Sequence, residues 1–118
     1  MSPKRGDRVA PPPVGHEWDL RFATGEAASG WEELCRQAKE NTRRAYEAIR
    51  TDPRPNPPTG RHHRLKGKIL AHGTRDGRLL ERWQYEVTAG GRIWYLVDDT
   101  KRTVWIEYAG TAHPKITE

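Results

Sequence analysis

Four basic residues lie close together near the middle of the chain: Arg61, Arg64, Lys66 and Lys68. On a strand, alternate side chains point to the same face, so Arg64, Lys66 and Lys68 would form one positively charged stripe. Such a stripe can follow the phosphates of an RNA backbone. It is equally typical of a solvated edge strand, on which lysines prevent pairing with another chain.

Histidines accompany this basic segment. His62 and His63 are adjacent, and His72 follows nine residues after His63. Adjacent side chains point to opposite faces of a strand, and the spacing to His72 is not that of a zinc site. The sequence therefore predicts neither a bound metal ion nor another cofactor.

Charge and size limit the class of protein. The 118 residues are enough for one domain, and the formal charge of +5 favours a polyanionic partner such as nucleic acid, or an acidic protein. A solvated basic surface without a partner accounts for the charge equally well. The mean hydropathy of -0.99 is strongly polar, so the five tryptophans must supply much of a thin core.

The sequence gives few signals for export or membrane insertion. Cys35 is the one cysteine, which excludes an intrachain disulfide, and its helical spacing predicts a small core residue. No apolar run approaches the roughly 18–20 residues that span a bilayer. The basic segment 1–13 lacks the apolar centre of a signal peptide. We therefore expect a cytoplasmic protein without a membrane partner.

The first half of the chain predicts a strand and two helices after a flexible basic tail at residues 1–15, where three prolines follow one another. In the segment 16–23, apolar and polar residues alternate as in a half-buried strand. From 25 to 50 the apolar residues take helical spacing. Ser29 is a possible N-cap, and we favour a helical hairpin with a break near 39–41 over a single long helix, because Asn41-Thr42 could cap a second helix. The apolar helical positions are Trp31, Leu34, Cys35, Ala38, Ala45, Tyr46 and Ile49.

The second half predicts an antiparallel meander. Four prolines in the segment 51–60 end the helical region, and strand patterns then alternate with the turn signals Asp76-Gly77 and Gly90-Gly91. The run from Ile93 to Val97 is apolar on both faces, as in a central strand. The expected fold class is α+β: an N-terminal strand, two helices, then an antiparallel sheet, with 16–118 as one domain.

This order of elements, together with four sequence motifs, resembles the RelE/ParE superfamily of bacterial toxins. The motifs are HRLKGKI (63–69), ERWQYEV (81–87), GRIWYLVDD (91–99) and VWIEYAGTAHPK (104–115). The resemblance covers residues 16–118. RelE-like and YoeB-like members cut mRNA, usually on the ribosome, and an antitoxin protein holds them inactive. The resemblance thus implies a metal-independent mRNA endoribonuclease with mRNA, the ribosome and a cognate antitoxin as partners.

The resemblance also implies roles for individual residues. Arg92 occupies the position of the family's phosphate-binding arginine, and a planar guanidinium suits phosphate oxygens. His113 lies where YoeB-like members place a histidine general acid, and imidazole titrates near neutral pH. Lys115 would add positive charge from the same C-terminal segment, and Glu86 would act as the base.

Two features leave the function open. RelE itself carries two lysines on the strand where this chain has Gln84 and Glu86, so a YoeB-like arrangement of glutamate, arginine and histidine fits better, with Glu81 as a rival carboxylate. ParE members share the fold but inhibit DNA gyrase without catalysis, and fold alone does not decide function. The alternatives are therefore a ParE-like inhibitor of a protein target, or an interaction protein that retains only antitoxin binding.

Overall fold

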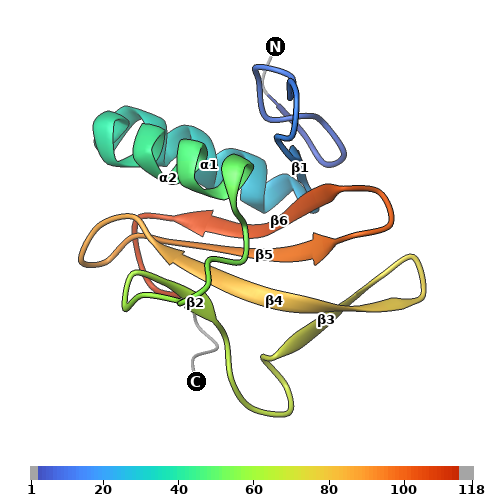
Figure 1. Ribbon diagram of the computed structural model, residues 1–118. Helices are drawn as coiled ribbons and strands as arrows, with labels where there is room; N and C mark the ends of the chain where they lie inside the picture. Colours follow the sequence, from blue (N-terminus) through green and yellow to red (C-terminus); the bar gives the residue numbers. More distant parts are fainter. Residues whose placement is uncertain (1–2, 115–118) are drawn as a thin grey trace.

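The computed structural model describes residues 3–114 and has the expected α+β order of elements (Figure 1). A first strand and two helices precede five further strands. Their bounds are β1 Asp19–Phe22, α1 Gly25–Gln37, α2 Lys39–Thr51, β2 His62–Arg64, β3 His72–Arg75, β4 Arg78–Glu86, β5 Arg92–Asp98 and β6 Thr103–Gly110.

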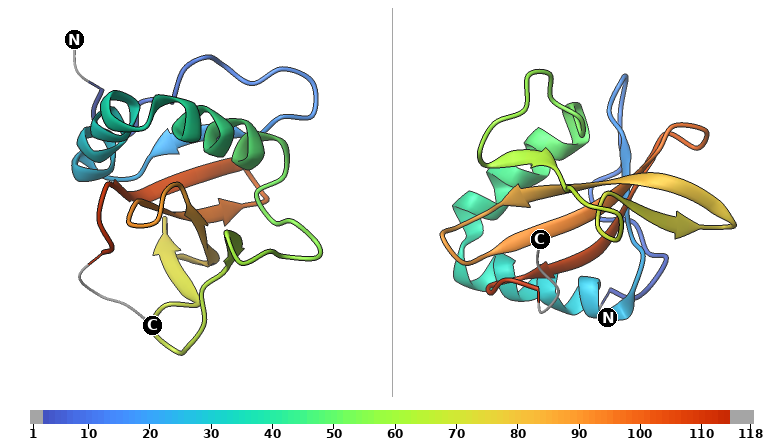
Figure 2. Two further views of the ribbon diagram at one scale, coloured as in Figure 1. Left: turned by 90° about the vertical axis from the view of Figure 1, so that its left-hand side faces the viewer. Right: turned by 90° about the horizontal axis from the view of Figure 1, so that it is seen from below.

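All the strands join one sheet in the order β1-β6-β5-β4-β2, with β3 also paired to β4. β1 runs parallel to β6, and the other pairs are antiparallel. Both helices cover the same face of the sheet (Figures 1 and 2). The opposite face, called the open face below, carries no helix. Within the described residues, neither helix is long and apolar enough to cross a membrane.

The alternation in the sequence corresponds to these two faces. Trp83, Tyr85 and Val87 are buried in the main core beneath the helices, whereas Gln84 and Glu86 lie on the open face. β5 lies in the middle of the sheet, and all of its residues are buried. The predicted central strand is therefore confirmed.

The predicted turns are confirmed as well. Asp76 and Gly77 both have positive φ, at 52° and 75°, in the two-residue connection of β3 to β4. Such a turn matches the twist of the two strands, and glycine reaches this conformation without steric cost. At the next connection the Val87 amide donates to the Gly91 carbonyl at 3.0 Å, which closes the turn between β4 and β5.

The start of the first helix differs from the expectation. Thr24, not Ser29, is the N-cap, and its Oγ1 accepts a hydrogen bond from the Ala27 amide at 2.9 Å. α1 therefore begins at Gly25, about one turn earlier than Ser29 implied. Threonine satisfies an amide that has no partner within the first turn of a helix, and Glu26 adds a favourable negative charge there.

The helical hairpin exists, but its break lies at Ala38 rather than at 39–41. Thr42 does not cap α2. Its hydroxyl instead donates to the Leu34 carbonyl at 3.1 Å, which also accepts from the Ala38 amide at 2.8 Å. The Thr42 side chain thus bonds α2 to the last turn of α1.

Cys35 is exposed, so the prediction that it is a core residue is wrong. The buried positions of α1 are Ala27, Ala28, Trp31 and Leu34. Cys35 lies one residue beyond Leu34, at the exposed edge of this stripe, and the sequence pattern alone did not distinguish the two positions. Cys35 instead lines a small pocket beside Pro11 and Tyr46.

The N-terminal segment packs on the domain where a flexible tail was expected. The Val9 amide donates to the Leu20 carbonyl at 2.8 Å, and the Gly6 amide donates to the Phe22 carbonyl at 2.7 Å. Val9 itself is 5% exposed and belongs to the main core. Farther along, Tyr46 Oη donates to the Pro11 carbonyl at 2.9 Å. The prolines are thus compatible with an extended segment that lies along the outer edge of β1.

α1 crosses β6 at very short range. A Cβ added to Gly30 would lie 1.6 Å from the carbonyl oxygen of Ala109 and 2.6 Å from its carbonyl carbon. Any side chain at position 30 would therefore overlap the backbone of β6. The contact lies next to Gly110, where β6 ends and the C-terminal segment begins.

His62 is a buried histidine within the core. Its Nε2 contacts Tyr95 Oη, and that hydroxyl donates to the Pro53 carbonyl at 2.5 Å. His62 and Tyr95 together attach the proline-rich segment 51–60 to β5. Burial lowers the pKa of His62 from 6.5 to about 4 because the charged ring would lose its hydration, although Asp52 and the Pro53 carbonyl oppose the shift.

We expect the fold to lose stability as the pH falls through this range. In the unfolded chain His62 takes up a proton near pH 6.5, whereas in the folded protein it does so only near pH 4. The neutral His62 ring therefore makes its full contribution to the free energy of unfolding above pH 6.5. This contribution is lost between pH 6.5 and pH 4, up to about 3 kcal/mol. Urea unfolding at pH 7 and pH 4.5 measures the loss. An equal loss in His62→Gln would exclude His62 as the cause.

Candidate functional site

Three residues singled out in the sequence meet on the open face of the sheet. Arg92 Nη2 lies 3.1 Å from Glu86 Oε2 and 3.2 Å from His113 Nε2. Arg92 is 7% exposed, Glu86 is partly exposed and His113 is exposed. We call this group the Glu86–Arg92–His113 cluster. The guanidinium of Arg92 is buried, and the carboxylate of Glu86 and the imidazole of His113 lie nearer the surface.

The sheet register explains this meeting. Glu86, the last residue of β4, pairs directly with Arg92, the first residue of β5, and Arg92 pairs with Gly110 at the end of β6. Side chains of directly paired residues lie on the same face about 5 Å apart. His113 then reaches the pair from the segment that leaves β6.

Arg92 is more extensively bonded than a free phosphate-binding arginine would be. Its Nη1 donates to the carbonyls of Thr88, Ala89 and Gly91 at 3.0–3.1 Å. Nη1 therefore fixes the turn between β4 and β5. Nη2 is the atom that faces Glu86 and His113, so a phosphate group would be bound at this edge of the guanidinium.

The contact with Arg92 also fixes the protonation of the imidazole in this state. A guanidinium can only donate, so His113 Nε2 is the acceptor and the ring proton is on Nδ1. For His113 to act as an acid through Nε2, the ring must take up a second proton and turn away from Arg92. Binding of a phosphate at Nη2 would favour that change, because it gives Arg92 a new partner.

Tyr108 positions the segment that carries His113. Its Oη donates to the Ala112 carbonyl at 2.5 Å, and its ring packs edge-on against Trp94 with centroids 6.5 Å apart. A Cβ on Gly110 would lie 2.5 Å from the same hydroxyl. The segment after β6 can therefore fold back onto Tyr108 because position 110 is a glycine. Tyr108 was not identified from the sequence, because an aromatic residue on a strand is ordinarily a packing residue.

Replacing Tyr108 by phenylalanine is expected to loosen this segment without unfolding the sheet. The ring keeps its contact with Trp94, and one hydrogen bond, typically about 1 kcal/mol, is lost. In NMR spectra the His113 ring signals should move toward those of an unrestrained histidine, with the His63 signals unchanged. Unaltered His113 signals would show that the hydroxyl does not position the segment.

The basic cluster is not the single stripe that the sequence predicted. Only Arg64 belongs to β2, which ends there. Leu65 turns into a small apolar group with Leu70 and Trp94, and Gly67 has a φ of 93°, so Lys66 and Lys68 follow in a loop. The four residues share a region of the surface but not one strand face.

Arg61 and Arg64 have different surroundings. Arg61 Nη1 donates to the carbonyls of Glu86 and Val87 at 3.0 and 3.3 Å, and its side chain lines a small pocket with Asn41 and Arg44 on the helix side of the sheet. Arg64 Nη2 lies 2.7 Å from His72 Nε2 and its Nη1 is 3.7 Å from Glu81. Glu81, the rival carboxylate, therefore lies with Arg64 and not with Arg92.

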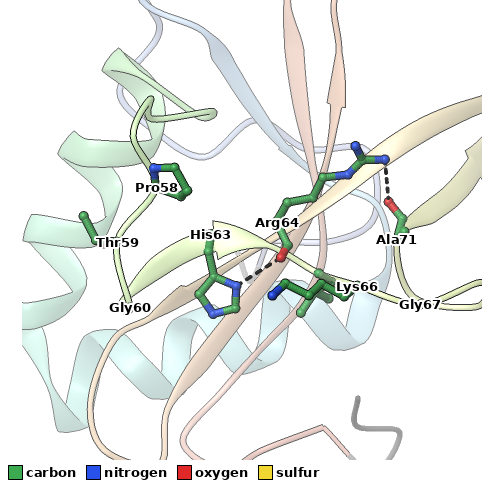
Figure 3. A pocket seen from close by; sticks show the side chains of 9 residues that line it. Pro58, Thr59, Gly60, His63, Arg64, Lys66, Gly67 and Ala71 are labelled. Carbon is green, nitrogen blue, oxygen red and sulfur yellow. Dashed lines mark hydrogen bonds between the residues drawn. The ribbon is translucent and has the colours of Figure 1, made fainter.

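An open pocket of about 760 Å³ lies beside β2 (Figure 3). It is lined by Pro58, Thr59, Gly60, His63, Arg64, Leu65, Lys66, Gly67 and Ala71. Arg64 reaches away across its rim toward Ala71, whereas His63 and Lys66 lie near each other at its mouth. His63 was considered in the sequence only as a metal ligand and dismissed, so its place here was missed.

The remaining predictions concern residues or groups outside this geometry. Lys115 lies outside the described residues. Among residues 3–114, no group of three or more histidine, cysteine, aspartate or glutamate side chains is arranged to hold a metal ion.

No protein-family model matches this chain, and no curated protein matches it either. The site must therefore be interpreted from its own geometry.

Proposed function

We propose that this protein is a metal-independent endoribonuclease that cleaves mRNA, with the Glu86–Arg92–His113 cluster as its active site. The observation that carries the proposal is the contact of one guanidinium with both a carboxylate and an imidazole. Cleavage of RNA without a metal needs a base, an acid and a cation near the phosphate. The cluster supplies one of each within a single hydrogen-bonded group.

The reaction assigns one role to each residue. The Glu86 carboxylate takes the proton of the ribose 2′-hydroxyl as that oxygen attacks the adjacent phosphorus. The bond from phosphorus to the 5′-oxygen breaks, and His113 in its imidazolium form gives that oxygen a proton. Arg92 Nη2 stabilises the additional negative charge on the phosphate. The products are a 2′,3′-cyclic phosphate and a free 5′-hydroxyl.

The surface around the cluster is suited to a polyanionic substrate. Arg64 and Lys66 line the neighbouring pocket, and Arg61 bonds to the backbone carbonyl of Glu86 from the helix side of the sheet. The chain as a whole carries a formal charge of +5. Contacts of this kind bind phosphates regardless of sequence and weaken as salt is added.

The order of elements and the motifs support a toxin of the RelE/ParE type within this proposal. A cognate antitoxin protein would then keep the nuclease inactive, and the substrate would be mRNA bound to the ribosome. An acidic or amphipathic segment of that partner could cover the basic surface beside the cluster.

One observation favours a second function. Arg92 already donates to three carbonyls and contacts Glu86, so its guanidinium is fully accounted for as a structural element of the turn. A ParE-like inhibitor that binds a protein target, such as gyrase, needs the same surface but no reacting group. In that case the cluster would only stabilise the end of the sheet.

Induced expression, followed by mapping of RNA 5′ ends across cellular mRNA, separates these functions. New 5′-hydroxyl ends together with growth arrest would support the ribonuclease. Arrest with intact mRNA would exclude it in favour of a protein-target inhibitor. Absence of arrest would leave a protein that only binds its antitoxin.

A further inference from the structure

The pocket beside β2 is close to the proposed active site but separate from it. His63 pairs with Gln84 across β2 and β4, and Glu86 is the next residue of β4 on the same face as Gln84. Diagonal neighbours of this kind lie about 7–8 Å apart. That offset is comparable to the length of one nucleotide in an extended strand. Because Arg92 Nη2 lies 3.1 Å from Glu86 Oε2, an RNA whose scissile phosphate is bound between these two groups can place its neighbouring nucleotide at His63.

A chain of hydrogen bonds fixes which atoms His63 can use. Trp94 Nε1 can only donate, and it lies 2.7 Å from Gln84 Oε1, which sets the orientation of that amide. The amide nitrogen of Gln84 then faces His63 Nε2 at 3.5 Å. His63 Nδ1 lies 3.1 Å from the Arg64 carbonyl, an acceptor, so Nδ1 carries the proton.

This leaves His63 Nε2 as an acceptor whose present contact is long. A hydrogen bond between nitrogen atoms is weak at 3.5 Å, compared with the usual separation near 3 Å. The ring lines the pocket, so a donor in the pocket can approach Nε2 (Figure 3). An amino group that projects from the edge of a nucleobase is a donor of the right kind; uracil has no amino group, and its one donor, the ring N3–H, is set back between two carbonyl oxygens.

The walls of the pocket suit the rest of a nucleotide. Pro58 and Ala71 offer apolar surface for the face of a base, and Lys66 adds positive charge for a phosphate. Two glycines, Gly60 and Gly67, have nothing within 4 Å of an added Cβ, so the mouth is open. The volume of about 760 Å³ is within the range of small-molecule sites.

We propose that this pocket binds the base next to the scissile phosphate, and that His63 selects a base with an exocyclic amino group. The inference rests on the proposed ribonuclease function and adds a specificity residue to it. His63 accepts a hydrogen bond from the amino group of adenine, cytosine or guanine. Uridine at this position offers only its ring N3–H, which lies between two carbonyl oxygens and does not project toward His63 Nε2 as an amino group does.

Calorimetric titration of the full chain with nucleoside 3′-monophosphates tests the pocket without any cleavage. Adenosine and cytidine 3′-monophosphates should bind more tightly than uridine 3′-monophosphate, by about 3- to 10-fold, the value of one hydrogen bond. His63→Ala should remove this preference. Lys66→Ala, on an exposed loop, should weaken all the nucleotides together. His16→Ala, which alters an exposed histidine elsewhere, is the matched control.

Several outcomes would overturn the inference. Equal affinity for the uridine and adenosine nucleotides, or an unchanged preference in His63→Ala, would remove the role of His63. Competition by inorganic phosphate that is as strong as that by whole nucleotides would show an anion site rather than a base site.

Cleavage is measured separately on ribosome-bound mRNA. Binding without cleavage would contradict the ribonuclease and retain the pocket. Cleavage with no base preference at the neighbouring position, and no nucleotide binding, would contradict the pocket alone.

Discussion

Replacing His113 by alanine is expected to reduce mRNA cleavage by about 10²- to 10⁴-fold, the usual contribution of a positioned acid or base. The leaving 5′-oxygen would then depart without a proton. Because His113 is exposed, we expect the free energy of unfolding to change by no more than about 0.5 kcal/mol. Cleavage by the purified protein on ribosome-bound mRNA and urea unfolding measure the two effects.

The pattern of the two measurements matters more than the size of either. His16→Ala is a suitable control, since it removes an exposed imidazole far from the cluster in the sequence. Full cleavage in His113→Ala would exclude this residue as the acid. A large fall in stability would instead mean that the imidazole is part of the framework around Arg92. The proposed mechanism requires lost activity with preserved folding.

Gly30→Ala should destabilise the fold by about 3 kcal/mol or more, at the upper end of the range for overpacked sites. The added Cβ would lie 1.6 Å from the Ala109 carbonyl oxygen; the helix backbone fixes the Cβ and the strand backbone fixes the oxygen, so neither atom can rotate away. α1 and β6 would have to separate. Because Ala109 precedes the segment that carries His113, cleavage should fall as well. Thermal or urea unfolding gives the stability change directly.

Gly25→Ala is the matched control for this substitution. It makes the same chemical change in the same helix, but nothing lies within 4 Å of the added Cβ. Its stability should be equal to or slightly above that of the wild type, since alanine favours helix more than glycine does. Similar losses in both variants would show that backbone freedom in α1, rather than the contact with β6, determines the result.

Much of the fold could be predicted from local patterns. Alternation put Trp83 and Tyr85 on one face of a strand, which is the face beneath the helices in the structure, and the Asp76-Gly77 pair marked a turn in which both residues have positive φ. The wrong predictions concern residues whose contacts come from another element of the fold rather than from their own helix. Thr42 bonds to Leu34 instead of capping its own helix, and Cys35 lies in a small surface pocket with Pro11 and Tyr46 instead of in the core. Spacing within one helix does not determine such choices.

The candidate site was only partly accessible from the sequence. Glu86 and Arg92 flank a short turn, so their pairing follows from the register of a hairpin. The arrival of His113 depends on Tyr108 and Gly110, whose roles appear only when β6 is in place. The pocket is still less predictable, because it needs the turn at Gly67 and the chain of donors from Trp94 to His63.

The segment that lies along β1 has a consequence for aggregation. An uncovered edge strand offers unpaired amides and carbonyls to any other extended chain. Here residues 6–9 occupy those groups through antiparallel bonds to Leu20 and Phe22, so the chain covers this edge of its own sheet. A shortened protein that begins at residue 16 would uncover both the edge and the apolar surface beneath Val9. Such a protein would tend to form intermolecular β-sheet at concentrations at which the full chain stays dispersed.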